Sequence, residues 1–487
     1  MYKAGIIGSG VAGLATAARL SSSGYKVTVF ESNDYPGGKL TEVKQDGYRF
    51  DAGPSLFTMP HLLDEIFRDA GKNPRDYFKY EKIEPGCHYF WTDGTEFRAF
   101  SDTERFASDA SEAFGVDPEA IREYIRSCEK AYDITEDVFL KRSLHKAGTY
   151  LRTSTLKSFF QLHRAKIFST LNDVNASKLK NPKLVQLFNR YATYNGSNPY
   201  EAPGTLMVIP TLEYRWGTFL PEGGMHAITE SLYKLCTDLG VKFKFCEKVE
   251  EIALEKNQVT GLRAAGKNFD FDLVVSNMDV VPTYKSLLQG IDLPKRIEQQ
   301  ERSSSALIFY WGVRREFPEL GLHNIFWSDN YREEFDCVFN QKKIYEDPTV
   351  YINITSKYSE GDAPGGCENW FVMVNAPCNA GQDWVNEIAK TRKNILSKLS
   401  SMLKVDVEQL IETENMLTPL DIEKKTSSYL GSLYGTSSNS RTAAFFRHPN
   451  FHRKIKNLFF CGGSVHPGGG IPLCLLSGKI TSELINE

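Results

Sequence analysis

The stretch KAGIIGSGVAGLATAARLSSSGYKVTVFE, residues 3–31, decides the fold that we predict for this 487-residue chain. Its apolar runs Lys3–Ile7 and Lys26–Phe30 are typical of buried strands, and residues 8–13 between them have the spacing G-x-G-x-x-G at the start of a helix. Glycines at these positions allow a tight turn, a close approach of the backbone to a pyrophosphate and close packing of helix on strand. Glu31 ends the second strand, where an acidic side chain can bind ribose hydroxyls. The stretch therefore predicts a Rossmann-type dinucleotide-binding unit.

A second glycine-rich stretch, NLFFCGGSVHPGGGIPLCLLSGKI at residues 457–480, predicts the last part of the same site. Residues 458–461 have the apolar character of a buried parallel strand, and three glycines then precede Ile471 and Pro472. A proline in the first turn of a helix removes no useful hydrogen bond, and the free N–H groups of that turn favour an anion. We therefore expect a strand, a turn and the beginning of a helix that faces the cofactor.

Further motifs decide which dinucleotide is bound. A glycine pair, Gly37 and Gly38, followed by the basic Lys39, comes directly after the second strand, as in flavoproteins with this type of Rossmann unit. Together with YRFDAGPS at 48–55, FLPEGGM at 219–225, VVSN at 274–277 and HPGGGIP at 466–472, these motifs span essentially the whole chain. On them the chain resembles bacterial-type carotenoid desaturases, the phytoene dehydrogenase family within the flavin amine-oxidase-like superfamily.

The resemblance implies FAD as a non-covalently bound cofactor, with the backbone of Val249 at the adenine edge. The residues that we expect at the cofactor are Gly8, Ser9, Gly10, Ala12, Gly13, Glu31, Ser32, Gly38, Lys39, Gly53, Pro54, Ser55, Val249, Asn277, Gly463, Gly470 and Ile471. Backbone N–H groups at the helix that begins near Ile471 would stabilise negative charge on the reduced flavin ring. No catalytic residue is predicted, because loss of hydride from a polyene leaves a delocalised cation whose proton is already acidic.

The resemblance also implies a carotenoid substrate, from which two hydrogens are removed. The stretches 191–209 and 214–221 resemble desaturases of the 3,4-bond of 1-hydroxylated or γ-carotene-type carotenoids more than phytoene desaturases. A phytoene desaturase, a carotene isomerase, a retinol-saturase-like enzyme and a non-redox protein with a structural flavin remain alternatives. An amine oxidase is less favoured, since the stretch 466–472 differs from that family's. Neither oxygen nor a quinone is singled out as the electron acceptor.

Composition excludes several other classes of function. The net charge of −3 gives no general attraction to nucleic acid. The nine cysteines form no C-x-x-C pair, and three glycines interrupt the apolar N-terminal stretch, so a cytoplasmic chain with reduced thiols is expected and not a secreted one. No apolar run approaches the roughly 20 residues of a membrane-spanning helix. His448 and His452 are predicted to lie in a surface loop, and no metal site is expected.

We predict an α/β protein in which a Rossmann-type FAD-binding domain is interleaved with a mixed-sheet substrate domain and a helical, membrane-facing lid. The FAD-binding domain would comprise residues 1–85, 221–290 and 420–487, the substrate domain residues 86–100, 181–220 and 291–419, and the lid residues 101–180. Within the substrate domain, residues 337–339 are expected to form a strand. Asp102 and Asp117 are expected to begin helices in the lid.

The lid contains a basic tract, which we define as residues 138–172. It has seven basic residues and no acidic one, interleaved with phenylalanine, leucine and isoleucine: Lys141, Arg142, Lys146, Arg152, Lys157, Arg164 and Lys166. The composition alone favours a solvated helical face, whereas a lipid-soluble substrate favours reversible docking on an anionic membrane surface. At about 1 kcal/mol per basic residue near the headgroups, four contacts would give roughly 4 kcal/mol, enough for peripheral association.

Four polar residues are candidates for a place beside the flavin ring: Asp51, Glu213, Arg215 and His466. For Asp51 a turn or helix-capping role is favoured over that of a base. Cys461 and His466 are the only motif residues that could link covalently to a flavin, and neither link is expected.

Overall fold

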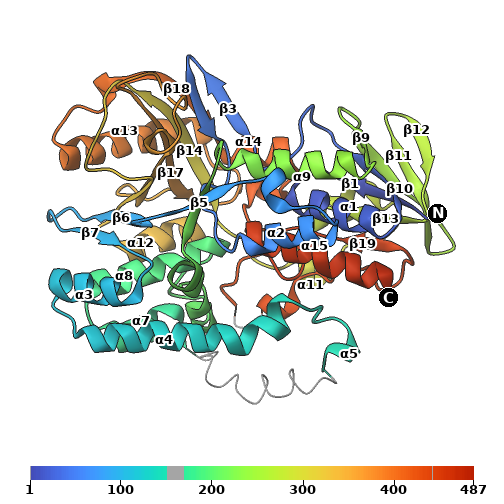
Figure 1. Cartoon of the computed structure of the whole chain (residues 1–487), viewed down its shortest axis with the longest axis horizontal. Coiled ribbons are helices and arrows are strands. Elements are labelled where there is room, and N and C mark those ends of the chain that lie inside the picture. The colour runs from blue at the N-terminus through green and yellow to red at the C-terminus, as the bar shows by residue number, and fades with distance from the viewer. Residues whose placement is uncertain (1, 151–168, 441–442) are drawn as a thin grey trace.

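The computed structural model describes residues 2–150, 169–440 and 443–487, and its centre of organisation is a five-stranded parallel sheet (Figure 1). The strand order is β19-β13-β1-β2-β9, and every neighbouring pair is parallel. These strands are β1 (Lys3–Ile7), β2 (Lys26–Phe30), β9 (Lys242–Lys244), β13 (Leu273–Ser276) and β19 (Leu458–Phe460). Helix α1 (Val11–Ser22) connects β1 to β2 and packs against α9 (His226–Asp238) and α15 (Ile471–Asn486). The predicted Rossmann-type unit and its C-terminal completion are therefore confirmed.

A small antiparallel sheet and two hairpin-like pairs surround this unit. The three-stranded sheet consists of β10 (Val249–Glu255), β11 (Gln258–Ala264) and β12 (Lys267–Asp270). The pairs are β3 (Glu42–Gln45) with β4 (Tyr48–Asp51), and β5 (Tyr80–Ile83) with β8 (Thr218–Pro221). Short helices complete the region: α2 (His61–Asp69), α10 (Val280–Pro282), α11 (Lys295–Glu298) and α14 (Pro419–Thr426).

The second large element is a seven-stranded mixed sheet, ordered β18-β14-β17-β16-β15-β6-β7. Its strands are β6 (Cys87–Phe90), β7 (Glu96–Ala99), β14 (Ser305–Val313), β15 (His323–Phe326), β16 (Val350–Ile354), β17 (Glu368–Ala376) and β18 (Ile411–Leu417). Only β15 and β6 pair in parallel; the chain leaves this sheet after β7 and returns to it at β14, about 205 residues later. Helix α13 (Trp384–Leu403) packs its buried side chains on one part of the sheet.

A group of helices lies beneath the β6–β7 end of this sheet (Figure 1). It comprises α3 (Thr103–Phe114), α4 (Pro118–Thr135), α7 (Leu171–Leu179) and α8 (Pro182–Asn189), and a short α5 (Ala147–Tyr150) follows α4. Asp102 and Asp117 cap α3 and α4 through their side chains, as predicted. Within the described ranges, no helix is long and apolar enough to cross a membrane. Much of the basic tract, residues 151–168, lies outside the described residues.

One predicted strand is wrong. Residues 337–339 continue α12 (Tyr331–Asp336) as a single wide helical turn over Cys337–Gln341. Asn330 caps this helix, and a run of three apolar residues is too short to distinguish a strand from a buried helical face. The domain boundaries stay a prediction, although the parallel sheet draws its strands from residues 3–30, 242–276 and 458–460.

Candidate functional site

A single cavity of about 1500 Å³ brings the predicted motifs together. Of the predicted cofactor residues, those that line it are Gly8, Gly10, Ala12, Glu31, Ser32, Gly38, Lys39, Gly53, Pro54, Ser55, Val249, Asn277, Gly463, Gly470 and Ile471. Ser9 and Gly13 lie directly behind the wall, in contact with residues that line it. Side chains of the mixed sheet, such as Tyr310 and Tyr351, line the same cavity, so it extends from one sheet to the other.

Three glycines at the cofactor end, Gly10, Gly13 and Gly462, lie against the side chain of Asn277, which directly follows β13. A Cβ atom at Gly10 would lie 2.8 Å from Asn277 Nδ2, and one at Gly462 would lie 2.9 Å from Asn277 Oδ1. At Gly13 a Cβ would lie 2.9 Å from Asn277 Nδ2 and only 2.3 Å from the carbonyl oxygen of Gly8. Asn277 therefore fills the inner side of the glycine turn, and the bare backbone on the outer side faces the cavity.

Glu31 is held by the turn that it faces. Its Oε2 accepts hydrogen bonds from the backbone N–H of Ser9 at 2.9 Å and from the Ser9 hydroxyl at 2.7 Å. Its Oε1 accepts from the backbone N–H of Asn33 at 3.0 Å. The carboxylate is thus oriented at the cavity wall, and Ser9 acts behind it as a positioning residue.

Two helices begin at the cavity without a side-chain cap. Gly10 precedes α1 and Gly470 precedes α15, and neither helix has a side chain bonded to its first-turn N–H groups in the described structure. Gly470 has φ of +100°, a conformation that favours glycine. Unbonded N–H groups at a helix N-terminus stabilise negative charge. Both ends can therefore bind anionic groups of a dinucleotide.

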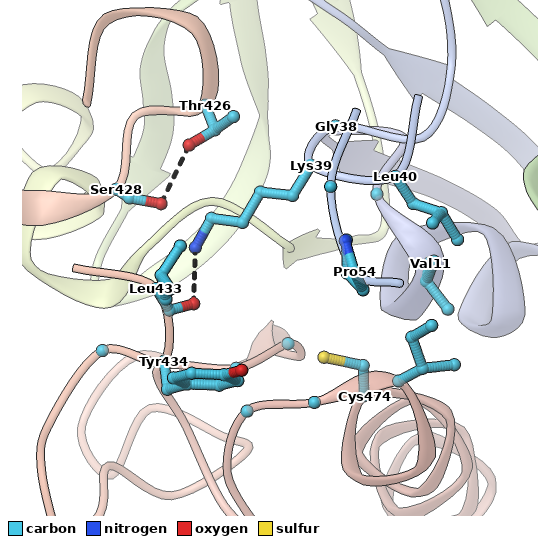
Figure 2. Close-up of a pocket in the computed structure, with 18 of the residues that line it drawn as sticks. Val11, Gly38, Lys39, Leu40, Pro54, Thr426, Ser428, Leu433, Tyr434 and Cys474 are labelled. Carbon is cyan, nitrogen blue, oxygen red and sulfur yellow. Dashed lines mark hydrogen bonds between the residues drawn. The ribbon is translucent and has the colours of Figure 1, made fainter. Parts of the chain in front are cut away.

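Lys39 extends across the cavity from the second glycine pair (Figure 2). Its Nζ donates hydrogen bonds to the carbonyl oxygens of Leu433, at 2.7 Å, and Ser432, at 3.3 Å. Burial lowers the pKa of Lys39 to about 8, although the carboxylate of Asp279 acts in the opposite direction. Lys39 can therefore exchange its proton near neutral pH.

Two of the four polar candidates do not reach the cavity. Asp51 is buried, forms an ion pair with Arg49 at 2.6 Å, and accepts hydrogen bonds from the N–H groups of Met225 and His226 at the beginning of α9. This is the capping role favoured from the sequence. Arg215 forms an ion pair with Asp133 at 2.6 Å, outside the cavity lining.

Glu213 lines the cavity as part of a buried polar cluster. It forms an ion pair with Arg190 at 3.2 Å and accepts hydrogen bonds from the hydroxyls of Tyr191 and Tyr194. The Arg190 guanidinium also lies 4.6 Å from the centre of the Tyr191 ring. The backbone oxygen of Tyr194 is 4.0 Å from the position of a Cβ at Gly470, so the cluster lies beside the beginning of α15.

His466 also lines the cavity, and it is neutral. Its Nε2 lies 2.7 Å from the carbonyl oxygen of Arg142, which can only accept a hydrogen bond. Burial lowers the pKa of His466 to about 3. It is therefore a poor acid or base at neutral pH.

The surface-loop prediction for His448 is wrong. The side chain is buried, and its Nε2 accepts a hydrogen bond from the Tyr284 hydroxyl at 2.9 Å, because its Nδ1 faces the carbonyl oxygen of Pro449. The proline-containing stretch packs against β19 and so encloses this ring.

Several polar residues of the cavity were not predicted: Arg190, Tyr194, His323, Tyr351 and Arg447. They come from segments far apart in the chain and belong to no spaced motif. The pairing of strands and the packing of helices bring them to one cavity, so no motif spacing within the sequence singled them out.

Comparison with known proteins assigns the family. A family model for flavin containing amine oxidoreductases matches residues 11–486. The chain is 55% identical over 485 residues to the 1-hydroxycarotenoid 3,4-desaturase of Flavobacterium sp. (strain P99-3), with 100% of this chain and 99% of that protein covered. It is 33% identical to the 4,4'-diapolycopene oxygenase of Methylomonas sp, covering 99% and 97%, and 31% identical to the phytoene desaturase of Fusarium fujikuroi, covering 99% and 88%.

Solved structures of low sequence identity share the fold. Putrescine oxidase bound to putrescine has a TM-score of 0.64 at 13% identity, covering 100% of this chain and 99% of that one. An oxidoreductase from Methanosarcina mazei has a TM-score of 0.62 at 14% identity and covers 100% of both chains. The glycine turn, the oriented Glu31 and the two uncapped helix ends suit a dinucleotide with a pyrophosphate. The chain belongs to the flavin-containing amine oxidoreductase family, and its cofactor is FAD, as the glycine motifs predicted.

Proposed function

We propose that this protein is an FAD-dependent carotenoid desaturase that removes two hydrogens from the 3,4-bond of a 1-hydroxylated or γ-carotene-type carotenoid. The observation that carries the proposal is the 55% identity, over the whole chain, to a 1-hydroxycarotenoid 3,4-desaturase. The relatives named as oxygenase and phytoene desaturase are 33% and 31% identical, so their activities are the less favoured candidates.

Different residues of the cavity would bind different parts of FAD. The glycine turn at residues 8–13 and the N–H groups of α1 would bind the pyrophosphate, Glu31 the ribose and the backbone of Val249 the adenine. Lys39, Asn277 and the segments 53–55 and 463–471 would enclose the remainder, with the beginning of α15 at the ring. When bound, the flavin supplies the chemistry by accepting hydride. The second hydrogen leaves the substrate as a proton while the C=C bond forms.

The cavity is large enough for a second molecule beside the cofactor. Its volume of about 1500 Å³ exceeds the roughly 300–1,000 Å³ that is usual for one small ligand. Apolar side chains from the mixed sheet and the helices line much of it, among them Leu140, Leu212, Ile308, Ile325 and Met373. Such a wall suits a polyene and excludes water from the reacting bond. We further propose that the enzyme associates peripherally with anionic membranes, and that oxygen or a quinone accepts the electrons.

The test is the mass of the carotenoid product. We expect a host that accumulates 1-hydroxylated acyclic carotenoids to form, on expression of this chain, a product lighter by two hydrogens with one more conjugated double bond. An unchanged mass would indicate an isomerase, a gain of two hydrogens a saturase, and an added oxygen an oxygenase. Acid precipitation should release the yellow colour from the protein, since the flavin is proposed to be non-covalent.

A further inference from the structure

The cavity wall contains a chain of hydrogen bonds that ends in a free acceptor. His323 on β15 and Asn353 on β16 lie directly opposite each other in the strand register, and Tyr351 is two residues before Asn353 on the same face. The Tyr351 hydroxyl lies 2.7 Å from His323 Nδ1 and 2.8 Å from Ser55 Oγ. Ser55, His323 and Tyr351 all line the cavity.

The direction of this chain follows from Asn353. Its Nδ2 lies 3.0 Å from the carbonyl oxygen of Leu322, which can only accept, so the atom at this position is the amide nitrogen. The same nitrogen lies 3.2 Å from His323 Nδ1, and two N–H groups would repel each other there. His323 Nδ1 is therefore an acceptor. Burial lowers the pKa of His323 to about 3 and raises that of Tyr351, so the ring stays neutral and the phenol keeps its proton.

With Nδ1 as an acceptor, each hydroxyl has a defined role. Tyr351 donates its proton to His323, so its oxygen accepts the proton of Ser55. Ser55 Oγ then has lone pairs that receive no hydrogen bond from the described residues. Glu213, another polar group of the cavity lining, already accepts from Arg190, Tyr191 and Tyr194. Ser55 Oγ is therefore an available acceptor on this part of the wall; among the other described lining residues, the buried Asn195 Oδ1 also receives no hydrogen bond.

Ser55 lies close to the proposed position of the flavin ring. It follows Pro54, which lies between the segment 38–40 and Cys474 in the first turn of α15 (Figure 2). In a 1-hydroxylated carotenoid the hydroxyl oxygen is three bonds from C3. A group that binds this hydroxyl must therefore lie beside the acceptor of hydride, and Ser55 meets this condition if the ring lies at the beginning of α15.

We propose that Ser55 Oγ accepts a hydrogen bond from the hydroxyl group at the end of the carotenoid, with Tyr351 and His323 as positioning residues. This inference rests on the proposed function and adds the determinant of substrate choice. A tertiary alcohol would donate a hydrogen bond to Ser55 Oγ, whereas a hydrocarbon end group would bury this oxygen against methyl groups without a hydrogen bond. The wall would thereby select hydroxylated over unhydroxylated polyenes and fix the 3,4-bond at the ring.

The experiment compares two substrates in the purified FAD-loaded enzyme: a 1-hydroxylated acyclic carotenoid and the same polyene without the hydroxyl. We expect Ser55→Ala to lower the ratio of kcat/KM for the hydroxylated substrate to kcat/KM for the unhydroxylated one by about tenfold, the effect of one lost hydrogen bond to a buried group. The change should appear as a higher KM for the hydroxylated substrate. Ser55→Thr, which keeps a hydroxyl group, should retain the wild-type ratio, and Tyr351→Phe should lower the ratio by less than Ser55→Ala does. Tyr310→Phe is the matched control, since it removes a phenol from another position of the cavity wall.

The possible outcomes distinguish a role of Ser55 in substrate choice from other roles. An unchanged ratio in Ser55→Ala, or a loss of selectivity in Tyr310→Phe in its place, would overturn the inference and leave the proposed function intact. Loss of flavin absorbance from Ser55→Ala, with the substrate ratio of the remaining FAD-loaded enzyme unchanged, would assign Ser55 to the cofactor alone and would also overturn the inference. Failure of the wild-type enzyme to desaturate either polyene would refute the proposed function, and the inference with it.

Discussion

Substitution of Gly13 by alanine tests the cofactor end of the site. The new Cβ would lie 2.3 Å from the carbonyl oxygen of Gly8, whereas ordinary contacts of this kind begin at 3.4 Å. Both atoms belong to backbone that is fixed by β1 and by the buried face of α1, so α1 must move by about 1 Å relative to the turn. Forced overpacking of this kind costs about 1–3 kcal/mol.

The shift should act on cofactor binding as well as on stability. The N–H groups of the first turn of α1 and of the glycine turn would no longer converge on one pyrophosphate. If between half and all of this strain falls on the FAD-bound state, FAD affinity should decrease by a factor between about two and about a hundred, since every 1.4 kcal/mol is a factor of ten. The assay is the flavin content after gel filtration, followed by titration of the apoprotein with FAD and by thermal unfolding with and without FAD.

Two other glycines provide a graded control. A Cβ at Gly478 in α15 would lie 3.1 Å from the carbonyl oxygen of Ala12, and one at Gly365 would meet nothing within 4 Å. Gly365→Ala should bind FAD normally, Gly478→Ala slightly less well and Gly13→Ala poorly. Equal FAD affinity in Gly13→Ala and Gly365→Ala would refute the argument, because it would show that the turn relaxes without disturbing the cofactor.

Three further predictions concern charge. The pKa of Lys39 is about 8 in the folded protein and 10.5 ordinarily, so between these pH values the folded apoprotein binds fewer protons than the unfolded chain, and the contribution of Lys39 to stability should rise with pH. FAD affinity should fall over the same range, because the positive charge is lost. Lys39→Arg should abolish both trends, as measured by unfolding curves and by titration with FAD. Glu213→Ala should lower the free energy of unfolding by about 3–5 kcal/mol, because it leaves Arg190 buried without its carboxylate partner. Arg215→Ala breaks a more exposed ion pair and should cost less than about 1 kcal/mol. Equal losses of the two variants in denaturant unfolding would contradict this. Charge reversal of four residues in the basic tract should reduce co-sedimentation with anionic vesicles, and wild-type binding should weaken between about 0.05 and 0.5 M salt, with flavin content unchanged. The four residues are Lys141, Arg142, Arg164 and Lys166.

The cofactor end of this protein was predictable because its contacts are local in sequence. The turn at residues 8–13 and the run 468–470 place bare backbone at the beginning of a helix, and the pair Gly37 and Gly38 lies beside Gly10 of that turn; spacing alone identifies such positions. Even there, the sequence did not show which side chain packs against the glycines of the turn. In the structure it is Asn277, a residue about 265 positions away.

The substrate end was not predictable because its contacts depend on sheet register. His323 and Tyr351 meet only because β15 and β16 pair with His323 opposite Asn353, and a register shift of one residue in either strand would turn its side chain to the other face, away from Ser55. The wrong predictions of a strand at 337–339 and of a surface position for His448 also arise from contacts between distant segments. In both cases tertiary packing decides the outcome, and the local residue pattern is compatible with either.

This difference between the two ends has a consequence for how substrate choice can change. Backbone atoms provide most of the proposed contacts to the cofactor, so side chains elsewhere on the cavity wall can vary without loss of FAD. Side chains of β15 and β16 line the mixed-sheet part of the cavity, and each can be replaced within an intact sheet. A change from hydroxylated to unhydroxylated polyenes therefore needs only a few substitutions at positions such as 55 and 351, with the flavin and its hydride chemistry retained.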